Sequence, residues 1–243
     1  MNKILILGGG FAGVYTAKAL KKIGLRGCNI ELVSDNNYFI FQPLLPEVAA
    51  GTLNSADAVT PIRQMLKGIK FRNAEVSDID FNLKKVYIHQ GFKKSTHFIT
   101  YDHLVIALGQ ISNLDIVPGL RDHAFKMRSL QDAHDLRNHI IGCLELADVT
   151  KDNKLRERLL NFVVIGGGFS GVETVGEIKE MIDRLIPYYG SLTKNEVNFH
   201  IVEFANQLLP DMDKNIGEYT FRRFFKQNIK IHLNTSLEEV TQY

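Results

Sequence analysis

The residues with the clearest potential for chemistry are glycines, which recur in one fixed spacing. The pattern G-x-G-x-x-G occurs twice, in the triplets Gly8, Gly10, Gly13 and Gly166, Gly168, Gly171. In such a loop the first glycine permits a tight turn, and the second lets a pyrophosphate approach the backbone. The third lets a helix pack closely against the preceding strand. The N-terminus of that helix then faces the negative charge. Two such loops predict two dinucleotide sites.

The surroundings of both loops support this interpretation, because one glycine motif alone is weak evidence. An apolar run precedes each loop, at residues 4–7 and 162–165. Apolar residues at helical spacing follow each loop, and a second strand pattern comes next, at residues 30–33 and 199–203. Each copy therefore predicts the start of a βαβ unit with parallel strands. The alternative is a glycine-rich turn that has a packing role and binds no ligand.

The residue at the end of each second strand should face the adenosine ribose. In the second copy this residue is Glu203. A carboxylate there can accept hydrogen bonds from the ribose hydroxyls and would repel the 2′-phosphate of NADPH, so we expect a preference for NADH. In the first copy the position is Ser34, followed by Asp35. A hydroxyl can still bond a ribose, but more weakly than a carboxylate.

The segment between the two copies is rich in short strand patterns. Three runs separated by Asn, Lys and Gly turns predict a small β-meander at residues 76–79, 84–89 and 96–100. An apolar strand is expected at residues 103–109, and Pro118-Gly119 marks a turn and a domain crossing. Ser129 and Asp132 then resemble a capping box that opens a helix. We therefore predict an α/β fold with two Rossmann-like domains, residues 1–118 and 119–243, and a small β-meander.

Composition narrows the functional class. The chain has 243 residues, 45% of them hydrophobic and 23% charged, as in ordinary soluble proteins. A net charge of +2 argues against a nucleic-acid partner. Cys28 and Cys143 are too far apart in sequence for a redox motif, and the histidines show no metal-ligand spacing, so no metal is expected. The first apolar run reads as a strand rather than a signal peptide, which predicts a cytoplasmic protein.

Longer motifs make the resemblance specific. The strand 102–109 (DHLVIALG) between two glycine loops resembles the flavoproteins of the pyridine nucleotide-disulfide oxidoreductase type. Within that superfamily, the segment 36–49 (NNYFIFQPLLPEVA) is similar to the type II NADH dehydrogenases. Further similarity lies in residues 166–173 (GGGFSGVE), 187–189 (PYY), 201–203 (IVE) and 208–210 (LLP). The resemblance runs over nearly the whole chain. It implies a single-subunit, non-proton-pumping NADH:quinone oxidoreductase, whose NADH domain is inserted into its FAD domain.

The resemblance also implies roles for individual residues. FAD would contact Gly8, Gly10, Phe11, Ala12, Gly13, Ser34, Asp35, Gln42, Pro43, Val76, Ala107 and Gly109. NADH would contact Gly166, Gly168, Gly171 and Glu203. Leu108 stands where Thr is commoner, which removes one hydroxyl contact. Glu173 would lie near the nicotinamide and the flavin as the catalytic residue. Its alternative interpretation is a solvated first-turn glutamate favoured by the helix dipole.

The implied mechanism requires no protein nucleophile. A hydride would pass from the nicotinamide C4 to the flavin N5, while the protein supplies stacking, orientation and electrostatics. A quinone would then accept the electrons. A homodimer is left open.

Complete members of the family are longer, and we interpret this chain as truncated at its C-terminus. The family is peripheral to the membrane, so the full-length form is expected in the cytoplasm or at the cytoplasmic face of the inner membrane. The isolated chain should bind FAD weakly and show little activity. Two alternatives remain: a catalytically incompetent nucleotide-binding fragment, and a soluble flavin reductase that serves a protein acceptor. Sulfide:quinone reductases share the fold but need cysteines near the flavin.

Overall fold

The computed structural model describes residues 2–91 and 94–241, which form two compact units. Unit 1 comprises Met1–Phe41 and Val59–Ile111, and unit 2 comprises Gln42–Ala58 and Ser112–Tyr243. The crossing between the units near residue 111 lies close to the turn that the sequence suggested. The segment Gln42–Ala58 differs, because the sequence places it in the first domain whereas it packs within unit 2.

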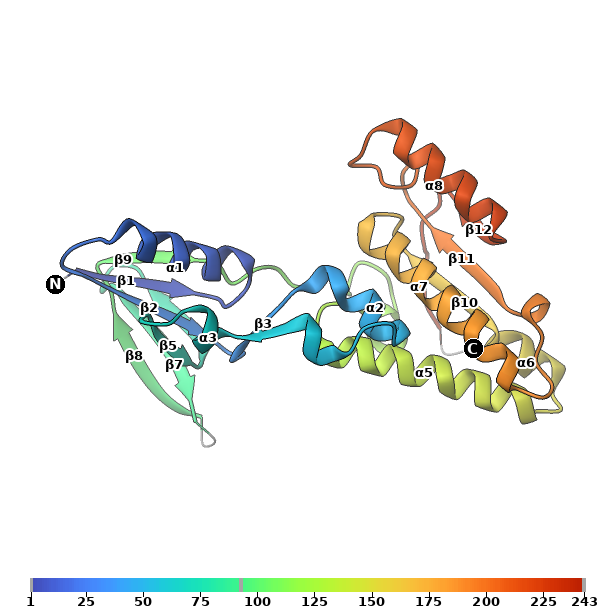
Figure 1. Cartoon of the computed structure of the whole chain (residues 1–243), viewed down its shortest axis with the longest axis horizontal. Helices are drawn as coiled ribbons and strands as arrows, with labels where there is room; N and C mark the ends of the chain where they lie inside the picture. The colour runs from blue at the N-terminus through green and yellow to red at the C-terminus, as the bar shows by residue number, and fades with distance from the viewer. Residues whose placement is uncertain (1, 92–93, 242–243) are drawn as a thin grey trace. The chain divides into compact units, whose positions relative to one another are not determined.

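Unit 1 is built on a four-stranded parallel sheet of order β5-β2-β1-β9. Helix α1 covers one face of this sheet, and the meander β6-β7-β8 covers the other, as Figure 1 shows. The elements of unit 1 are β1 (Asn2–Leu7), α1 (Phe11–Ile23), β2 (Cys28–Ser34), β3 (Tyr38–Ile40), β4 (Val59–Pro61), α3 (Ile62–Met65), β5 (Lys70–Asn73), β6 (Glu75–Asp80), β7 (Lys85–Gln90), β8 (Ser95–Thr100) and β9 (His103–Ile106).

Alternation along β1 explains both layers of unit 1. Ile4 and Ile6 pack with the residues of α1, whereas Leu5 and Leu7 pack with the meander. All four are buried, because successive side chains of a strand point to opposite faces. The meander is antiparallel throughout, and the prediction of three short strands is confirmed. The strand expected at residues 103–109 ends at Ile106, because residues 107–109 leave the ladder after one last bond from the Ala107 N–H to the Leu7 carbonyl.

Unit 2 contains a three-stranded parallel sheet of order β10-β11-β12, with α7 packed against β10 and β11. Its elements are η1 (Gln42–Leu44), α2 (Leu45–Ala50), η2 (Ser55–Ala58), α4 (Leu120–His123), α5 (Leu130–Val149), α6 (Asn153–Leu159), β10 (Asn161–Ile165), α7 (Phe169–Leu185), η3 (Ile186–Tyr188), η4 (Lys194–Glu196), β11 (Asn198–Val202), α8 (Lys214–Lys226) and β12 (Ile229–His232). Residues 242 and 243, at the end of the expected second domain, lie outside the described residues.

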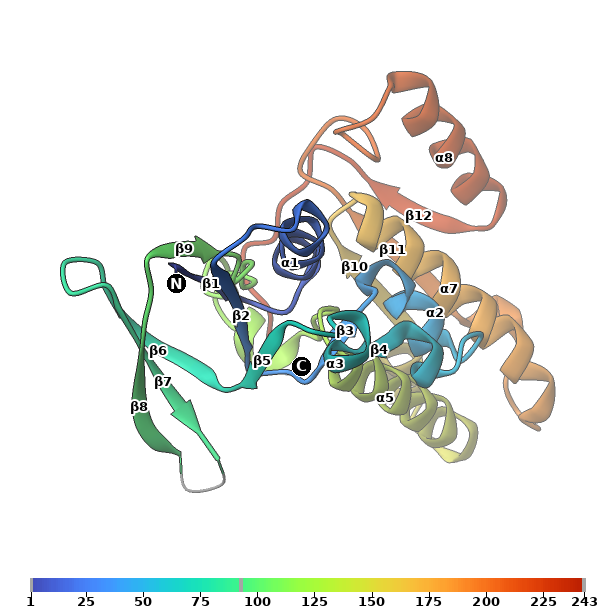
Figure 2. The ribbon, with the colours of Figure 1, turned by 60° about the vertical axis from the view of Figure 1, so that its left-hand side comes forward.

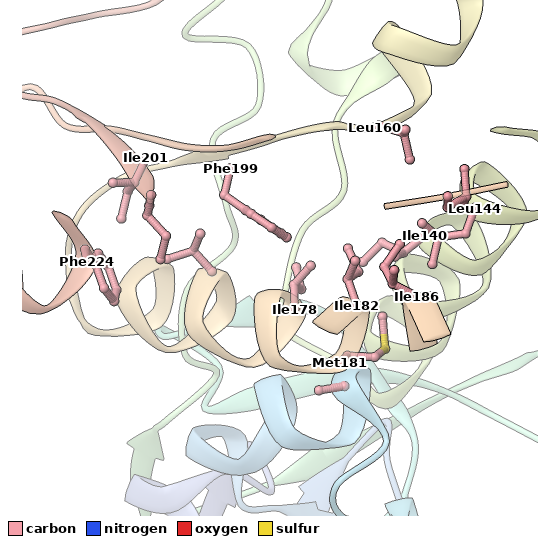
Figure 3. Packing of buried hydrophobic residues seen from close by; sticks show 14 of the residues in the cluster. Ile140, Leu144, Leu160, Ile178, Met181, Ile182, Ile186, Phe199, Ile201 and Phe224 are labelled. Carbon is pink, nitrogen blue, oxygen red and sulfur yellow. The ribbon is translucent and has the colours of Figure 1, made fainter. Parts of the chain in front are cut away.

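The core of unit 2 is shared by α5, α7 and the sheet. Figure 3 shows Ile140 and Leu144 of α5 beside Ile182 of α7, with Phe199 of β11 above α7. The start of α5 follows from its sequence, since the Ser129 hydroxyl accepts from the Asp132 N–H and the Asp132 carboxylate accepts from the Ser129 N–H. The predicted capping box is therefore confirmed.

Helix α2 is the reason that Gln42–Ala58 belongs to unit 2. Its side chains Leu45, Val48 and Ala49 are almost completely buried, and the helix packs against both α5 and α7 (Figure 2). The Thr52 hydroxyl, just beyond the helix, donates to the Glu177 carboxylate on α7 at 3.0 Å. Within the described residues, no helix is both long and apolar enough to traverse a bilayer.

Candidate dinucleotide sites

The first glycine of each loop adopts a backbone conformation that suits only glycine. Gly8 has φ +109° and Gly166 has φ +98°, both in the region that side chains with a Cβ rarely enter. Each stands directly after a strand, β1 or β10, where the chain must turn sharply toward a helix. The role predicted for these two glycines, a tight turn, matches their geometry.

The third glycines allow a close approach of helix and strand. A Cβ on Gly13 would lie 1.9 Å from the carbonyl oxygen of Gly8, and one on Gly171 would lie 1.8 Å from that of Gly166. No side chain fits at either position without moving backbone. This contact packs α1 onto β1 and α7 onto β10.

The second glycines face open space. Gly10 and Gly168 are the N-cap residues of α1 and α7, and no heavy atom lies within 4 Å of a Cβ built on either. No side chain caps either helix N-terminus, so the first backbone N–H groups stay available for an anion. The side chains of Phe11 and Ala12, in the first turn of α1, are exposed beside this opening. Both loops therefore fit a pyrophosphate group.

Two further glycines, Gly9 and Gly167, were not singled out from the sequence. A Cβ on Gly9 would lie 2.7 Å from the hydroxyl oxygen of Ser34, and one on Gly167 would lie 3.0 Å from Cβ of Glu203. A glycine is thus needed where the loop passes over the residue that ends the second strand. The available signal was the complete triplet GGG in both copies.

The strand-end residues differ between the copies as the sequence indicates. Glu203 is 9% exposed, and its carboxylate accepts from the Gly167 N–H at 2.5 Å and the Ala205 N–H at 2.6 Å. A carboxylate has about four acceptor positions, so two remain for ribose hydroxyls. Ser34 is equally buried, accepts from the Asn36 N–H at 3.3 Å and donates to the exposed Asp35 carboxylate at 3.4 Å.

Other residues expected near FAD gather at the same end of the unit 1 sheet. The carbonyl of Ala107 lies against Gly8, where it would block any Cβ. Gly109, with φ +77°, follows on the same segment. Val76 lies on β6, just after Ala74, whose N–H donates to the Ser34 carbonyl at 2.9 Å. The structure thus brings Gly8, Ser34 and Ala107 together.

Gln42 and Pro43 belong to unit 2, in the short helix η1. Both are exposed, and the Gln42 amide donates to the Arg128 carbonyl at 3.4 Å. Their assignment to the flavin stays a prediction.

Glu173 stands on α7 at the rim of a hollow of about 280 Å³. It is the fifth residue of α7, beyond the first turn, and its side chain is exposed. The solvated part of the alternative interpretation therefore fits Glu173, whereas the helix-dipole part does not. Partial burial, and then the charges of Glu47 and Glu177, raise the pKa of its carboxyl above the ordinary 4.5. One oxygen of Glu47 is buried and accepts no hydrogen bond from the described residues. The arrangement therefore makes the Glu173 carboxyl easier to protonate than an isolated glutamate.

Two observations concern the possible metal ligands and the cysteines. Among residues 2–91 and 94–241, no three His, Cys, Asp or Glu side chains are placed to hold a metal ion. Cys28 and Cys143 are free and half-buried, one in each unit, and burial raises the pKa of the Cys143 thiol.

Comparison with known proteins agrees with this geometry. Residues 2–243 match the family model "Pyridine nucleotide-disulphide oxidoreductase". The chain is 33% identical to the type II NADH:quinone oxidoreductase NdhA of Mycobacterium tuberculosis, over 98% of this chain and 51% of that protein. It is also 33% identical to the mitochondrial external alternative NAD(P)H-ubiquinone oxidoreductase B3 of Arabidopsis thaliana, over 98% of this chain and 42% of that protein.

A solved structure shows the same fold. The NDH2 of Plasmodium falciparum in complex with NADH matches with a TM-score of 0.91 and 27% identity, over 100% of this chain and 50% of that one. The chain spans about half the length of the curated relatives it matches. The matched family model and the shared fold support one conclusion: the chain belongs to the pyridine nucleotide-disulphide oxidoreductase family, in its type II NADH:quinone oxidoreductase branch.

Proposed function

We propose that this chain forms the FAD- and NADH-binding part of an enzyme that oxidises NADH and passes the electrons to a quinone. The observation that carries the proposal is the repetition of one loop geometry in two units. In both copies the first glycine has positive φ, the second faces open space, and the third packs against the turn. Two separate pyrophosphate sites suit a reaction between two dinucleotides better than the binding of one.

Unit 1 would hold FAD. Its loop of Gly8, Gly10 and Gly13 would receive the pyrophosphate, with Ser34 at the ribose, and Ala107 would close over the group. When bound, FAD would supply hydride acceptance from NADH and electron transfer to the quinone. The backbone N–H groups at the start of α1 would orient the phosphates, and the exposed ring of Phe11 would shield them from water.

Unit 2 would hold NADH. The loop of Gly166, Gly168 and Gly171 would receive its pyrophosphate, and the remaining acceptor positions of Glu203 would bond the ribose. The negative charge of Glu203, already buried, opposes a second phosphate at the same place. Glu173 would hold or release the proton that accompanies quinone reduction.

This proposal places the protein in a respiratory chain, in the cytoplasm or at the cytoplasmic face of the inner membrane. Its test is to purify the chain and measure three quantities: the flavin that it retains, NADH oxidation with a water-soluble quinone, and NADH oxidation without an acceptor. We expect the wild-type chain to bind added flavin weakly, and this binding to be lost when Gly10 is replaced by a bulky residue. Oxidation that requires the quinone supports the proposal. Retained NADH binding without any turnover would favour a nucleotide-binding fragment, and turnover with a protein acceptor alone would favour a flavin reductase.

A further inference from the structure

A second hollow in unit 2 is lined by none of the residues assigned to FAD or NADH. It measures about 330 Å³ and lies at the C-terminal end of α2, where the following turn leads into η2, and against α5. Figure 2 shows α2 beside α5 at this place. The hollow is lined by Val48, Gly51, Leu53, Asn54, Ser55, His134 and Arg137.

The guanidinium of Arg137 lies face-on over Gly51. A Cβ on Gly51 would be 3.0 Å from Cζ, 3.0 Å from Nη2 and 3.1 Å from Nη1 of Arg137, so these three atoms are nearly equidistant from it. Such equal distances arise when the flat group is stacked on the backbone. Gly51 has φ +70° and ends α2, so the absence of a side chain here is also required by the turn.

A stacked guanidinium keeps its hydrogen-bond donors free, because its five N–H groups lie in the plane rather than on the face. No hydrogen bond or ion pair to Arg137 occurs within the described part of the chain. A half-buried arginine without a partner is unusual, since a charged group taken partly out of water normally has a counter-charge. The Arg137 guanidinium therefore offers a cationic partner to a group in the hollow.

The other polar groups of the lining are also able to donate. His134 precedes Arg137 by one turn of α5, and a neutral or charged imidazole carries at least one N–H. Asn54 uses its side-chain oxygen to accept from the Ala56 N–H at 3.0 Å, which leaves its NH2 group as a donor. Ser55 contributes a hydroxyl. The lining includes no carboxylate.

We propose that this hollow binds a phosphate group, as inorganic phosphate or as a small phosphate monoester, with Arg137 as its main ligand. The planar fork of arginine matches two phosphate oxygens, and Asn54, Ser55 and His134 supply further donors. The volume lies at the lower end of the range for ligand pockets, which fits a small ligand rather than a dinucleotide. The proposal is independent of the function proposed above.

The test is amide NMR of the 243-residue chain, titrated with inorganic phosphate and then with glycerol phosphate. We expect the Gly51, Asn54 and Ser55 signals to shift, and these shifts to disappear in Arg137→Gln. Arg137→Lys should keep the shifts but weaken binding about tenfold, because the ammonium lacks the planar fork. Arg222→Gln is the matched control, since Arg222 is exposed on α8 and pairs with Glu218.

A lipid headgroup is the other possible source of the phosphate group. Sedimentation with phosphatidylcholine vesicles, with and without phosphatidic acid, separates the two sources. Capture by phosphatidic acid that depends on Arg137 assigns the site to a lipid phosphate, and its absence assigns it to a free phosphate. Shifts confined to the two glycine loops, or shifts at residues 51–55 that persist in Arg137→Gln, would overturn the proposal. His134→Asn, expected to weaken binding several-fold, provides the same test if Arg137→Gln does not fold.

Discussion

Gly168 and Gly171 stand three residues apart in the second glycine loop, yet alanine should have opposite consequences at the two positions. Gly168 faces open space at the start of α7, with an ordinary extended backbone. Gly171 lies inside the first turn, against the carbonyl of Gly166. The first substitution should therefore affect ligand binding, and the second should affect folding.

The expected size of each effect follows from the distances. In Gly171→Ala the new Cβ would lie 1.8 Å from the Gly166 oxygen. An ordinary carbon–oxygen contact is about 3.3 Å, so the backbone must separate by roughly 1.5 Å. We expect Gly171→Ala to lower the free energy of unfolding by at least about 3 kcal/mol, and the Tm by roughly 6–12 °C or more. In Gly168→Ala the new Cβ contacts no atom. An alanine at an N-cap lowers the free energy of unfolding by about 1 kcal/mol or less, which corresponds to a decrease in Tm of under roughly 4 °C.

The two readouts are thermal unfolding by calorimetry and NADH binding by fluorescence titration. Gly168→Ala should keep a nearly normal Tm while its methyl group, at the approach of the pyrophosphate, lowers NADH affinity about tenfold or more. Gly10→Ala and Gly13→Ala repeat the comparison in unit 1, with the affinity for added flavin as the readout. Wild-type stability of Gly171→Ala, or wild-type NADH affinity of Gly168→Ala, would refute the reasoning for both loops.

Three further substitutions test single side chains. Glu203→Gln replaces an acceptor whose hydrogen bonds are worth roughly 1.5–3 kcal/mol each, so the preference for NADH over NADPH should narrow about tenfold or more; equal affinity of the unmodified protein for both contradicts this. Glu47→Gln removes a like charge and should lower the pKa of Glu173 in a carboxyl NMR titration. The folded state holds the Glu173 proton more tightly than the unfolded chain does. The free energy of unfolding should therefore decrease as the pH rises above 4.5 through the raised pKa, and this decrease should be smaller in Glu47→Gln than in the wild type. Ser129→Ala removes the cap of α5 and should cost about 0.5–2 kcal/mol in urea unfolding; an unchanged midpoint would show that the capping box is dispensable.

The sequence predicts most of the secondary structure because local signals agree with the fold. Ser129 and Asp132 mark the start of α5 correctly, and the alternation around residues 84–89 marks β7. The position of α2 could not be read in the same way. Its six residues form a short apolar helix, and only the burial of Leu45 and Val48 against α5 and α7 assigns it to unit 2. Such a contact joins residues far apart in sequence, which periodicity cannot detect.

The glycine loops were predictable because each glycine of the motif is required by a particular backbone geometry. The surroundings of Glu173 and Arg137 were not. The pKa of Glu173 is raised first by partial burial and then by Glu47 of α2 and by Glu177, and the stacking of Arg137 depends on Gly51. In both cases α2, or the glycine that ends it, supplies one of the contacting groups, and the sequence gives no sign that α2 reaches either helix.

The two sheets show most clearly what a strand pattern leaves undetermined. Counted from the first glycine of each loop, Leu5 and Leu7 of β1 correspond to Val163 and Ile165 of β10. Leu5 and Leu7 are fully buried beneath the meander, whereas Val163 is 55% and Ile165 48% exposed. On the same open face, His200 and His232 stack with their ring nitrogens 3.0 Å apart. The apolar alternation is the same in both strands, so burial is decided by what packs over a face, and not by the strand itself.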